Sequence, residues 1–470
     1  MAQGTVYKSV FKNAAYIFFI KLFPAFAGII VLILYSRNLS QEDYGIYQDF
    51  WVKLLLIGTL VYAGLPVTII TYPADVVKGF IKKITTKHLL LYAMWALLWA
   101  AAFCYFFRNA AIGIWLLVPF LLLYAIHAVQ EAMLMASQKM KGLLAVNFLY
   151  AVYFLFLHIH FLKNYSLHLL ILGLMIGSIV RAIILLSLTI IVYRKVAAVS
   201  AQDQQLSKAR SLWLHLGFYD LIQTLFRYAD KFILASFLSA SVFAVYFNGA
   251  QSAEVPLLPY LLGAVASSLL LQLSDKKNNP YQSYKLLRDS GKLLSCIVFP
   301  LFFFLWFFAH EIFDVVFTEK YKDSVPVFLM AILVLPLRSY SYTTMLQHLH
   351  KGAIINKGAV LDLLLALGLM YPFYQIFGLP GVPLSFVIST YIQVVYYLWH
   401  TSRFINVPLL QLLPLKDWVL KLVVYGSLIG SMHFFLHAQA GDYSLMVGAA
   451  FTLLIVLVSI KLTTKTWMKR

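Results

Sequence analysis

Long apolar segments recur from one end of this 470-residue chain to the other, separated by short charged loops. Each segment is about 20 residues long, which is the length of a helix that crosses the hydrocarbon core of a bilayer. Hydrophobic residues make up 62% of the chain and charged residues 12%, a balance that excludes an ordinary soluble globular protein. The sequence therefore predicts an all-α polytopic membrane protein without a separate soluble domain.

Hydropathy divides the chain into about fourteen predicted spans. They cover residues 12–35, 45–72, 88–107, 110–136, 143–162, 167–193, 211–238, 242–272, 293–310, 325–347, 358–378, 380–402, 417–437 and 443–463. The first apolar run continues beyond the small residues Ala25 and Ala27, so we expect a spanning helix there rather than a cleaved signal peptide.

Basic residues are concentrated in alternate loops of this arrangement. The poorer side holds Arg37, Arg108, Lys163, Lys320 and Lys322. Because cytoplasmic loops carry an excess of Lys and Arg, we expect both termini in the cytoplasm and a multi-pass protein of the cell (inner) membrane. The net charge of +19 then has a topological meaning, and no nucleic-acid partner is expected.

The densest set of ionisable residues within an apolar run lies in residues 211–256. Helical spacing places one polar arc on the seventh span, formed by Asp220, Gln223, Thr224, Arg227, Asp230 and Lys231. Charged side chains in hydrocarbon normally face a bundle interior or a water-filled cavity. Two interpretations remain: Asp/Arg pairs that hold helices together, or a charged transport pathway, which we favour.

Other polar residues within spans are candidates for the same pathway or for pairing. Lys21 precedes Pro24, whose missing N–H favours a kink. Asp49 and Lys53 have the spacing of an intrahelical ion pair, which would leave Lys53 as the only ligand candidate of the two. Asp362 is a lone acid on the eleventh span, either a proton or sodium site or a partner for a cation.

Other polar and aromatic residues within the predicted spans also have more than one possible role. Structural pairing is as good an explanation as substrate contact for three residues, Glu131, Arg181 and Arg338. A broken helix beside the polar arc is suggested by Asn248, Gln251, Glu254, Pro256 and Pro259. Sugar stacking is a candidate role for Tyr219, Tyr228 and Tyr246. No histidine pair predicts a metal site, and His433 with His437 is expected to lack a nearby acid.

An internal repeat links the ends of the first and seventh spans. Residues 33–47, ILYSRNLSQEDYGIY, match residues 233–246, ILASFLSASVFAVY, with one gap. Both copies leave the cytoplasm in the same sense, which predicts two six-span halves related by an axis along the membrane normal, with the cavity between them. We expect lobes at residues 1–198 and 205–404, followed by two extra helices in residues 405–470.

Four segments carry a family resemblance: SRNLSQEDYGIYQDFW, ADKFIL, FTEKYKDSVPVF and FGLPGVP. In order and spacing they resemble the polysaccharide (Wzx-type) flippases of the multidrug/oligosaccharidyl-lipid/polysaccharide exporter superfamily. The resemblance implies two six-helix lobes plus two C-terminal helices, and movement of a polyprenyl-diphosphate-linked sugar to the outer leaflet. The lipid II flippase of this superfamily is similar too, and its cations on spans one, two and seven have counterparts in Lys21, Lys53 and Arg227.

We therefore predict a transporter, not an enzyme, that needs no cofactor. Its partners would be a lipid-linked oligosaccharide, the bilayer, an optional proton or sodium ion, and other polysaccharide-assembly membrane proteins. The predicted substrate-binding residues are Lys21, Lys53, Gln223, Arg227, Lys231, Asn248 and Gln251, and the residues for coupling or pairing are Asp220, Asp230, Glu254 and Asp362.

Two alternative functions are weighed against this one. A multidrug antiporter of the same superfamily would need an acidic or apolar cavity, and the gross charge of the spans does not decide the matter. A polysaccharide polymerase or ligase would be expected to need a sizeable external loop with acids and arginines. The longest candidate, residues 310–326, is short and contains no arginine.

Overall fold

The structure is a computed structural model that describes residues 2–107, 112–137, 139–197, 203–253, 258, 280–349, 351–439 and 443–468. Within these ranges every regular element is a helix, which confirms the predicted all-α class. Ten of the described helices are long and apolar enough to cross a membrane, so the predicted number of fourteen is not confirmed. Their apolar parts are Phe19–Asn38, Thr86–Phe106, Ile114–Ala136, Met140–His160, Leu167–Arg194, Tyr284–Phe307, Gly352–Phe377, Gly381–Ile405, Leu415–Leu436 and Ser444–Thr463.

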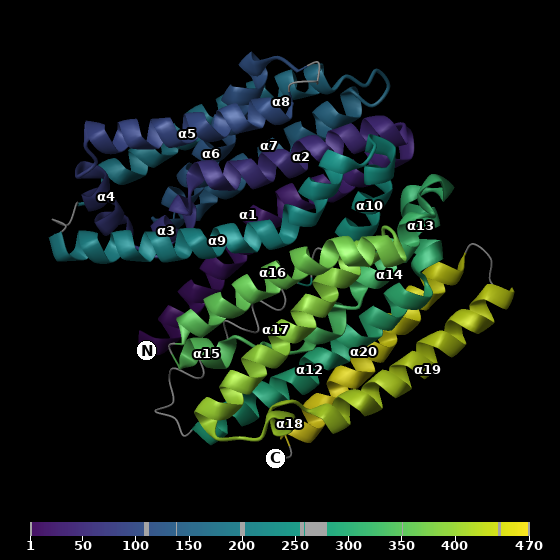
Figure 1. Ribbon diagram of the computed structural model, residues 1–470. Coiled ribbons are helices and arrows are strands. Elements are labelled where there is room, and N and C mark those ends of the chain that lie inside the picture. Colours follow the sequence, from purple (N-terminus) through teal and green to yellow (C-terminus); the bar gives the residue numbers. More distant parts are fainter. Residues whose placement is uncertain are drawn as a thin grey trace. The chain divides into compact units, whose positions relative to one another are not determined.

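The chain divides into two compact units, Met1–Phe243 and Ala244–Arg470. The helices of the first unit are α1 (Ala2–Asn38), α2 (Gln41–Tyr62), α3 (Leu65–Ile70), α4 (Ala74–Lys82), α5 (Thr86–Phe106), α6 (Ile114–Ala136), α7 (Met140–His160), α8 (Leu167–Arg194) and α9 (Asp203–Phe237). Its long helices run side by side (Figure 1). Helix α1 packs along α7 and α6 along α8, while α2 contacts α5, α6 and α9. The predicted lobe limits stay a prediction.

The second unit begins within α10 (Ala240–Ser252). Its other helices are α12 (Pro280–Phe307), α13 (Ala309–Phe317), η1 (Glu319–Tyr321), α14 (Ser324–Ile332), η2 (Leu335–Ser339), α15 (Thr344–His348), α16 (Gly352–Phe377), α17 (Gly381–Ile405), α18 (Leu409–Leu412), α19 (Leu415–Gln439) and α20 (Ser444–Met468). Helices α16 and α17 form one closely packed pair, and α14 packs on α17. The two last helices, α19 and α20, both pack against α12.

Two predicted spans that the structure describes in full are broken well inside their length. The span predicted at residues 45–72 breaks after α2, because Gly64 adopts φ 70°, a left-handed conformation that suits a residue without Cβ, and α3 follows with a proline in its first turn. The span predicted at residues 325–347 is divided into α14, η2 and α15. Here Pro336 has no N–H to donate and Tyr340 is extended, so the α-helix cannot pass through.

The internal repeat has a matching local structure in both copies. Ser40 and Ser239 each follow a helix and cap the next one, since their Oγ atoms accept hydrogen bonds from Asp43 N (3.0 Å) and Val242 N (3.4 Å). The Cβ of any larger residue at Gly45 would collide with the backbone of Ala240, so the two turns lie against each other in the first unit. The two segments thus share a serine cap, while the internal repeat and the symmetry axis stay predictions.

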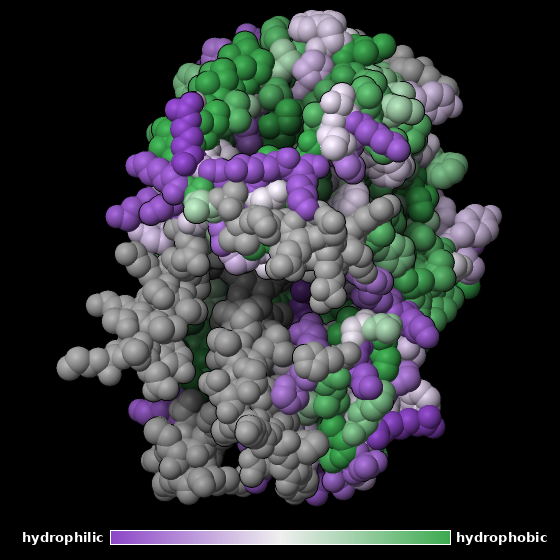
Figure 2. All heavy atoms as spheres, turned by 90° about the vertical axis from the view of Figure 1, so that its left-hand side faces the viewer, coloured by the Kyte–Doolittle hydropathy of each residue, from purple (hydrophilic) through white to green (hydrophobic). Residues whose placement is uncertain are grey.

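Helix α4 lies at one end of the helices of the first unit (left in Figure 1), and several lysines occur in it and just after it. Lys82, Lys83 and Lys87 are all exposed there. This end faces the viewer in Figure 2, which shows hydrophilic side chains in purple next to apolar ones in green. Lys78 instead turns inward, and its Nζ donates to the carbonyl oxygens of Tyr193 and Val196, both at 2.6 Å. It thereby caps the end of α8.

Candidate functional site

The polar arc predicted on the seventh span lies on α9 and has an exposed and a buried part. Gln223 and Arg227 are exposed and Asp220 is half-buried, whereas Asp230 and Lys231 are 6% and 4% exposed. The Nζ of Lys231 donates to the carbonyl oxygen of Arg227 (2.8 Å) and lies 3.7 Å from Asp230 Oδ2. The accessible groups of this arc are therefore Gln223 and Arg227, while the Lys231 ammonium is held inside the protein.

Helix α1 presents Lys21 near its middle, with an exposed side chain, three residues before Pro24. Because proline has no N–H, the carbonyl of Ile20 four residues earlier loses its helical donor. The Nδ2 atom of Asn147 in α7 lies 3.5 Å from this carbonyl oxygen. The carbonyl that Pro24 was expected to release therefore meets a polar group of a neighbouring helix.

Lys53 and Asp49 form the ion pair that their spacing predicted. The Nζ of Lys53 lies 2.5 Å from Asp49 Oδ2, and the ammonium is 4.9 Å from the centre of the Phe107 ring. Lys53 is 6% exposed. The intrahelical pairing is confirmed, and a role of Lys53 in substrate binding stays a prediction.

Structural pairing is also confirmed for Arg181 and Glu131. The Nη2 atom of Arg181 in α8 donates to Glu131 Oε1 in α6 and to Asn147 Oδ1 in α7, the latter at 2.9 Å. The guanidinium carbon lies 4.5 Å from the centre of the Tyr150 ring. One arginine thus joins α8 to α6 and α7, and it shares Asn147 with the Ile20 carbonyl of α1. Arg338, by contrast, lies in η2 of the second unit.

The remaining predicted polar residues of the eighth span are only partly described. Asn248 is fully buried and Gln251 is half-buried, both on α10. Glu254, Pro256 and Pro259 lie outside the described residues. A broken helix at this position therefore stays a prediction.

Asp362 lies between two closely packed helices of the second unit. It is 4% exposed on α16, and the Ser389 hydroxyl of α17 donates to its Oδ1 at 2.7 Å. None of the ion pairs between described residues involves Asp362. The contact that the structure provides is thus a hydroxyl rather than a cation, and a coupling role stays a prediction.

His433 does have an acid nearby, contrary to the sequence-based expectation. Its Nε2 lies 2.8 Å from Glu311 Oε1, which joins α19 to α13. The two residues are 122 positions apart, so the pair could not be found from local spacing. Among the described residues, no group of three or more potential metal ligands is found.

The tyrosines proposed for sugar stacking differ in accessibility. Tyr246 on α10 is fully buried, whereas Tyr219 on α9 is 38% exposed and Tyr228 is half-buried. Their stacking role stays a prediction.

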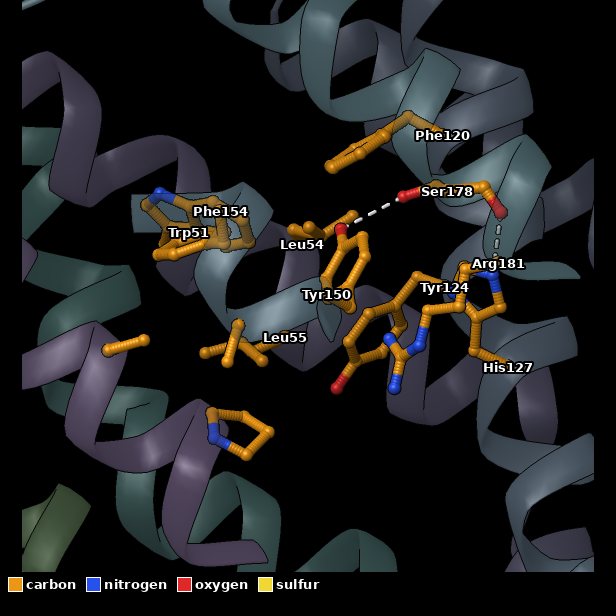
Figure 3. Close-up of a pocket in the computed structure, with 13 residues that line it drawn as sticks. Trp51, Leu54, Leu55, Phe120, Tyr124, His127, Tyr150, Phe154, Ser178 and Arg181 are labelled. Carbon is orange, nitrogen blue, oxygen red and sulfur yellow. Dashed lines mark hydrogen bonds between the residues drawn. The ribbon is translucent and has the colours of Figure 1, made fainter. Parts of the chain in front are cut away.

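A cavity of about 310 Å³ lies within the first unit, and apart from Arg181 and Pro24 its lining residues have no predicted role. Trp51, Tyr124, His127, Tyr150 and Ser178 belong to its wall, as Figure 3 shows. The only sequence signal for this site is the presence of polar and amphipathic side chains at mid-span.

Comparison with known proteins identifies the family of this chain. The sequence profile of the family described as polysaccharide biosynthesis protein matches residues 34–326, more than half of the chain. No curated protein matches the chain.

Solved structures share the fold. The chain is similar to the lipid II flippase MurJ in an inward closed conformation, with a TM-score of 0.68 at 15% identity over 96% of this chain and 100% of that chain. It is also similar to a multidrug resistance MATE family transporter of the MOP superfamily. The inward-facing conformation gives a TM-score of 0.60 at 14% identity, over 81% of this chain and 94% of that chain. The outward-facing conformation gives a TM-score of 0.56 at 14% identity, over 84% of this chain and 95% of that chain. This chain belongs to the polysaccharide biosynthesis protein family and has the fold of the transporters of the MOP superfamily.

Proposed function

We propose that this protein moves a polyprenyl-diphosphate-linked oligosaccharide from the cytoplasmic to the outer leaflet by alternating access, as a step in cell-surface polysaccharide assembly. Membership of the polysaccharide biosynthesis protein family is the observation that carries the proposal. The fold supports it, because the likeness to a lipid II flippase extends over 96% of the chain, compared with 81% for the inward-facing multidrug transporter.

The accessible cations supply the chemistry for a diphosphate. Lys21 on α1 and Arg227 on α9 are both exposed and both lie well inside helices of the first unit. A charged side chain at such a depth costs about 3 kcal/mol or more in hydrocarbon. Both groups are therefore expected to face a water-filled cavity. The guanidinium of Arg227 offers a fork that matches two phosphate oxygens, whereas the ammonium of Lys21 is a point charge. We assign the main diphosphate contact to Arg227.

Transport in proteoliposomes tests this assignment. The purified protein should flip the lipid-linked saccharide extracted from the membranes of its own organism, scored by access of a sugar-modifying reagent to the outer leaflet. Arg227→Lys should retain folding and lose most of the transport, and Arg227→Ala should lose nearly all of it. Lys82→Ala, which removes an exposed basic residue of α4, is the matched control and should transport normally.

The competing explanation is that Arg227 only neutralises Asp220 or Asp230. In that case Arg227→Ala combined with the relevant Asp→Ala would restore transport as well as expression, and the ligand assignment would be wrong. Export of organic cations without any flipping of the saccharide lipid would instead identify a multidrug antiporter and overturn the proposed function itself.

A further inference from the structure

The cavity of the first unit lies near the middle of the helices that surround it, which corresponds to the middle of a bilayer that they would span. Arg181 is central in α8 (Leu167–Arg194), and Tyr124 is close to the centre of α6 (Ile114–Ala136). Its volume of about 310 Å³ is at the lower end of the range of small-molecule sites, about 300–1,000 Å³. A space of this size at mid-membrane, lined by an arginine, calls for a functional explanation.

Flat aromatic rings form much of the wall. Trp51 comes from α2, Phe120 and Tyr124 from α6, and Tyr150 and Phe154 from α7 (Figure 3). These rings present rigid apolar faces on several sides of the cavity. The C–H face of a pyranose ring packs well on such a face, while its hydroxyls need hydrogen-bonding partners at the edge.

The same wall supplies those partners. The hydroxyls of Tyr150 and Ser178 are 3.0 Å apart, and either can donate or accept. His127 Nε2 lies 2.9 Å from the carbonyl oxygen of Ser178 (Figure 3). The hydroxyl pair thus offers a ligand hydroxyl both a donor and an acceptor.

The charge of the cavity wall is already balanced. Glu131 neutralises Arg181, which is also held by Asn147 and by the ring of Tyr150. A phosphate would have to displace the Glu131 carboxylate, and an organic cation would meet the guanidinium. An acyl chain would offer no partner to the hydroxyls of Tyr150 and Ser178. The chemistry that fits is therefore uncharged, ring-shaped and rich in hydroxyls.

We propose that this cavity binds one uncharged sugar ring of the lipid-linked saccharide, separately from the diphosphate. The inference rests on the proposed function and adds a saccharide subsite to it. The Tyr150–Ser178 hydroxyl pair provides the hydrogen bonds, and the rings of Trp51 and Tyr124 provide the apolar faces.

Filling the cavity separates sugar binding from structural effects. Ala151 of α7 and Ala27 of α1 are buried residues of its wall, so Ala151→Leu and Ala27→Leu each place a larger side chain in the space from a different helix. Because they fill a void, neither should lower the melting temperature. Ala145→Leu is the matched control, since Ala145 is an exposed residue of α7.

The experiment compares two lipids on the same nanodisc preparation: bare polyprenyl diphosphate and the lipid-linked saccharide purified from the organism's membranes. The wild type should prefer the saccharide lipid by about tenfold, the worth of one or two hydrogen bonds. Both cavity variants should lose this preference and keep the affinity for polyprenyl diphosphate within about twofold. Ala145→Leu should behave as the wild type.

Each other result overturns the inference. If both cavity variants keep the saccharide preference, the sugar is bound elsewhere and the proposed function still stands. If the affinity for bare polyprenyl diphosphate falls equally, the cavity serves the lipid chain or the bundle. If the wild type binds neither lipid in nanodiscs and flips neither in the proteoliposome assay, the proposed function fails and the subsite with it. Should Ala151→Leu not fold, Ala27→Leu decides alone.

Discussion

Removing the Glu131 carboxylate should destabilise the first unit measurably. Glu131→Gln keeps the side-chain shape but leaves the Arg181 guanidinium without its counter-charge at mid-membrane. The two side chains are 23% and 13% exposed. Breaking a buried ion pair costs about 3–5 kcal/mol in soluble proteins, while polar pairs in membranes average about 0.6 kcal/mol. Since Asn147 and Tyr150 still hold Arg181, we expect about 2 kcal/mol for Glu131→Gln.

A double-mutant cycle isolates the pair. Arg181→Met should also cost about 2 kcal/mol, and the double variant about 2 kcal/mol rather than about 4, because neither charge is then left alone. Unfolding in mixed micelles with increasing dodecyl sulfate, followed by circular dichroism, measures these free energies. Asp417→Asn is the control: Asp417 pairs with Lys421 at 2.8 Å but is 33% exposed, so we expect less than about 1 kcal/mol.

The cycle has a clear refuting result. If the double variant lowers the free energy of unfolding by as much as the two single variants together, Arg181 and Glu131 are not coupled. The claim that Glu131 balances the charge of Arg181 in the cavity wall would then be wrong. If Asp417→Asn costs as much as Glu131→Gln, burial of the pair is not what makes it important.

Two further predictions concern topology and energy supply. Single cysteines in a background without Cys104 and Cys296 test the topology. Lys195→Cys and Lys285→Cys should resist an impermeant thiol reagent added to intact cells, while Glu319→Cys should react with it. Labelling of Lys285→Cys from outside would show that the span arrangement is wrong. A diphosphate diester carries about two negative charges, so its outward movement gains roughly 4–5 kcal/mol per 100 mV. Collapsing the potential in proteoliposomes at equal pH and sodium should therefore slow flipping several-fold, and an unchanged rate would exclude this driving force.

Local features of this protein could be predicted from sequence. The lengths of apolar runs follow from the thickness of the bilayer, so the all-helical class was predictable. At Ser40 and at Ser239 the serine side chain accepts a hydrogen bond from the N–H three residues later. The Asp49–Lys53 pair spans one helical turn. Each of these involves neighbours in sequence, where the helix geometry alone sets the distance.

The breaks and the contacts between helices were decided by tertiary structure. The residues on both sides of Gly64 and of Pro336 are apolar, so hydropathy predicts one unbroken span at each place, although the helix is interrupted there. Glu131 and Arg181 are 50 positions apart, and sequence left their pairing open because lipid-embedded helices carry no hydrophobic stripe that identifies the partner face. The cavity beside them is bounded by five helices, α1, α2, α6, α7 and α8. Its shape depends on how these helices pack, which no spacing along the chain encodes.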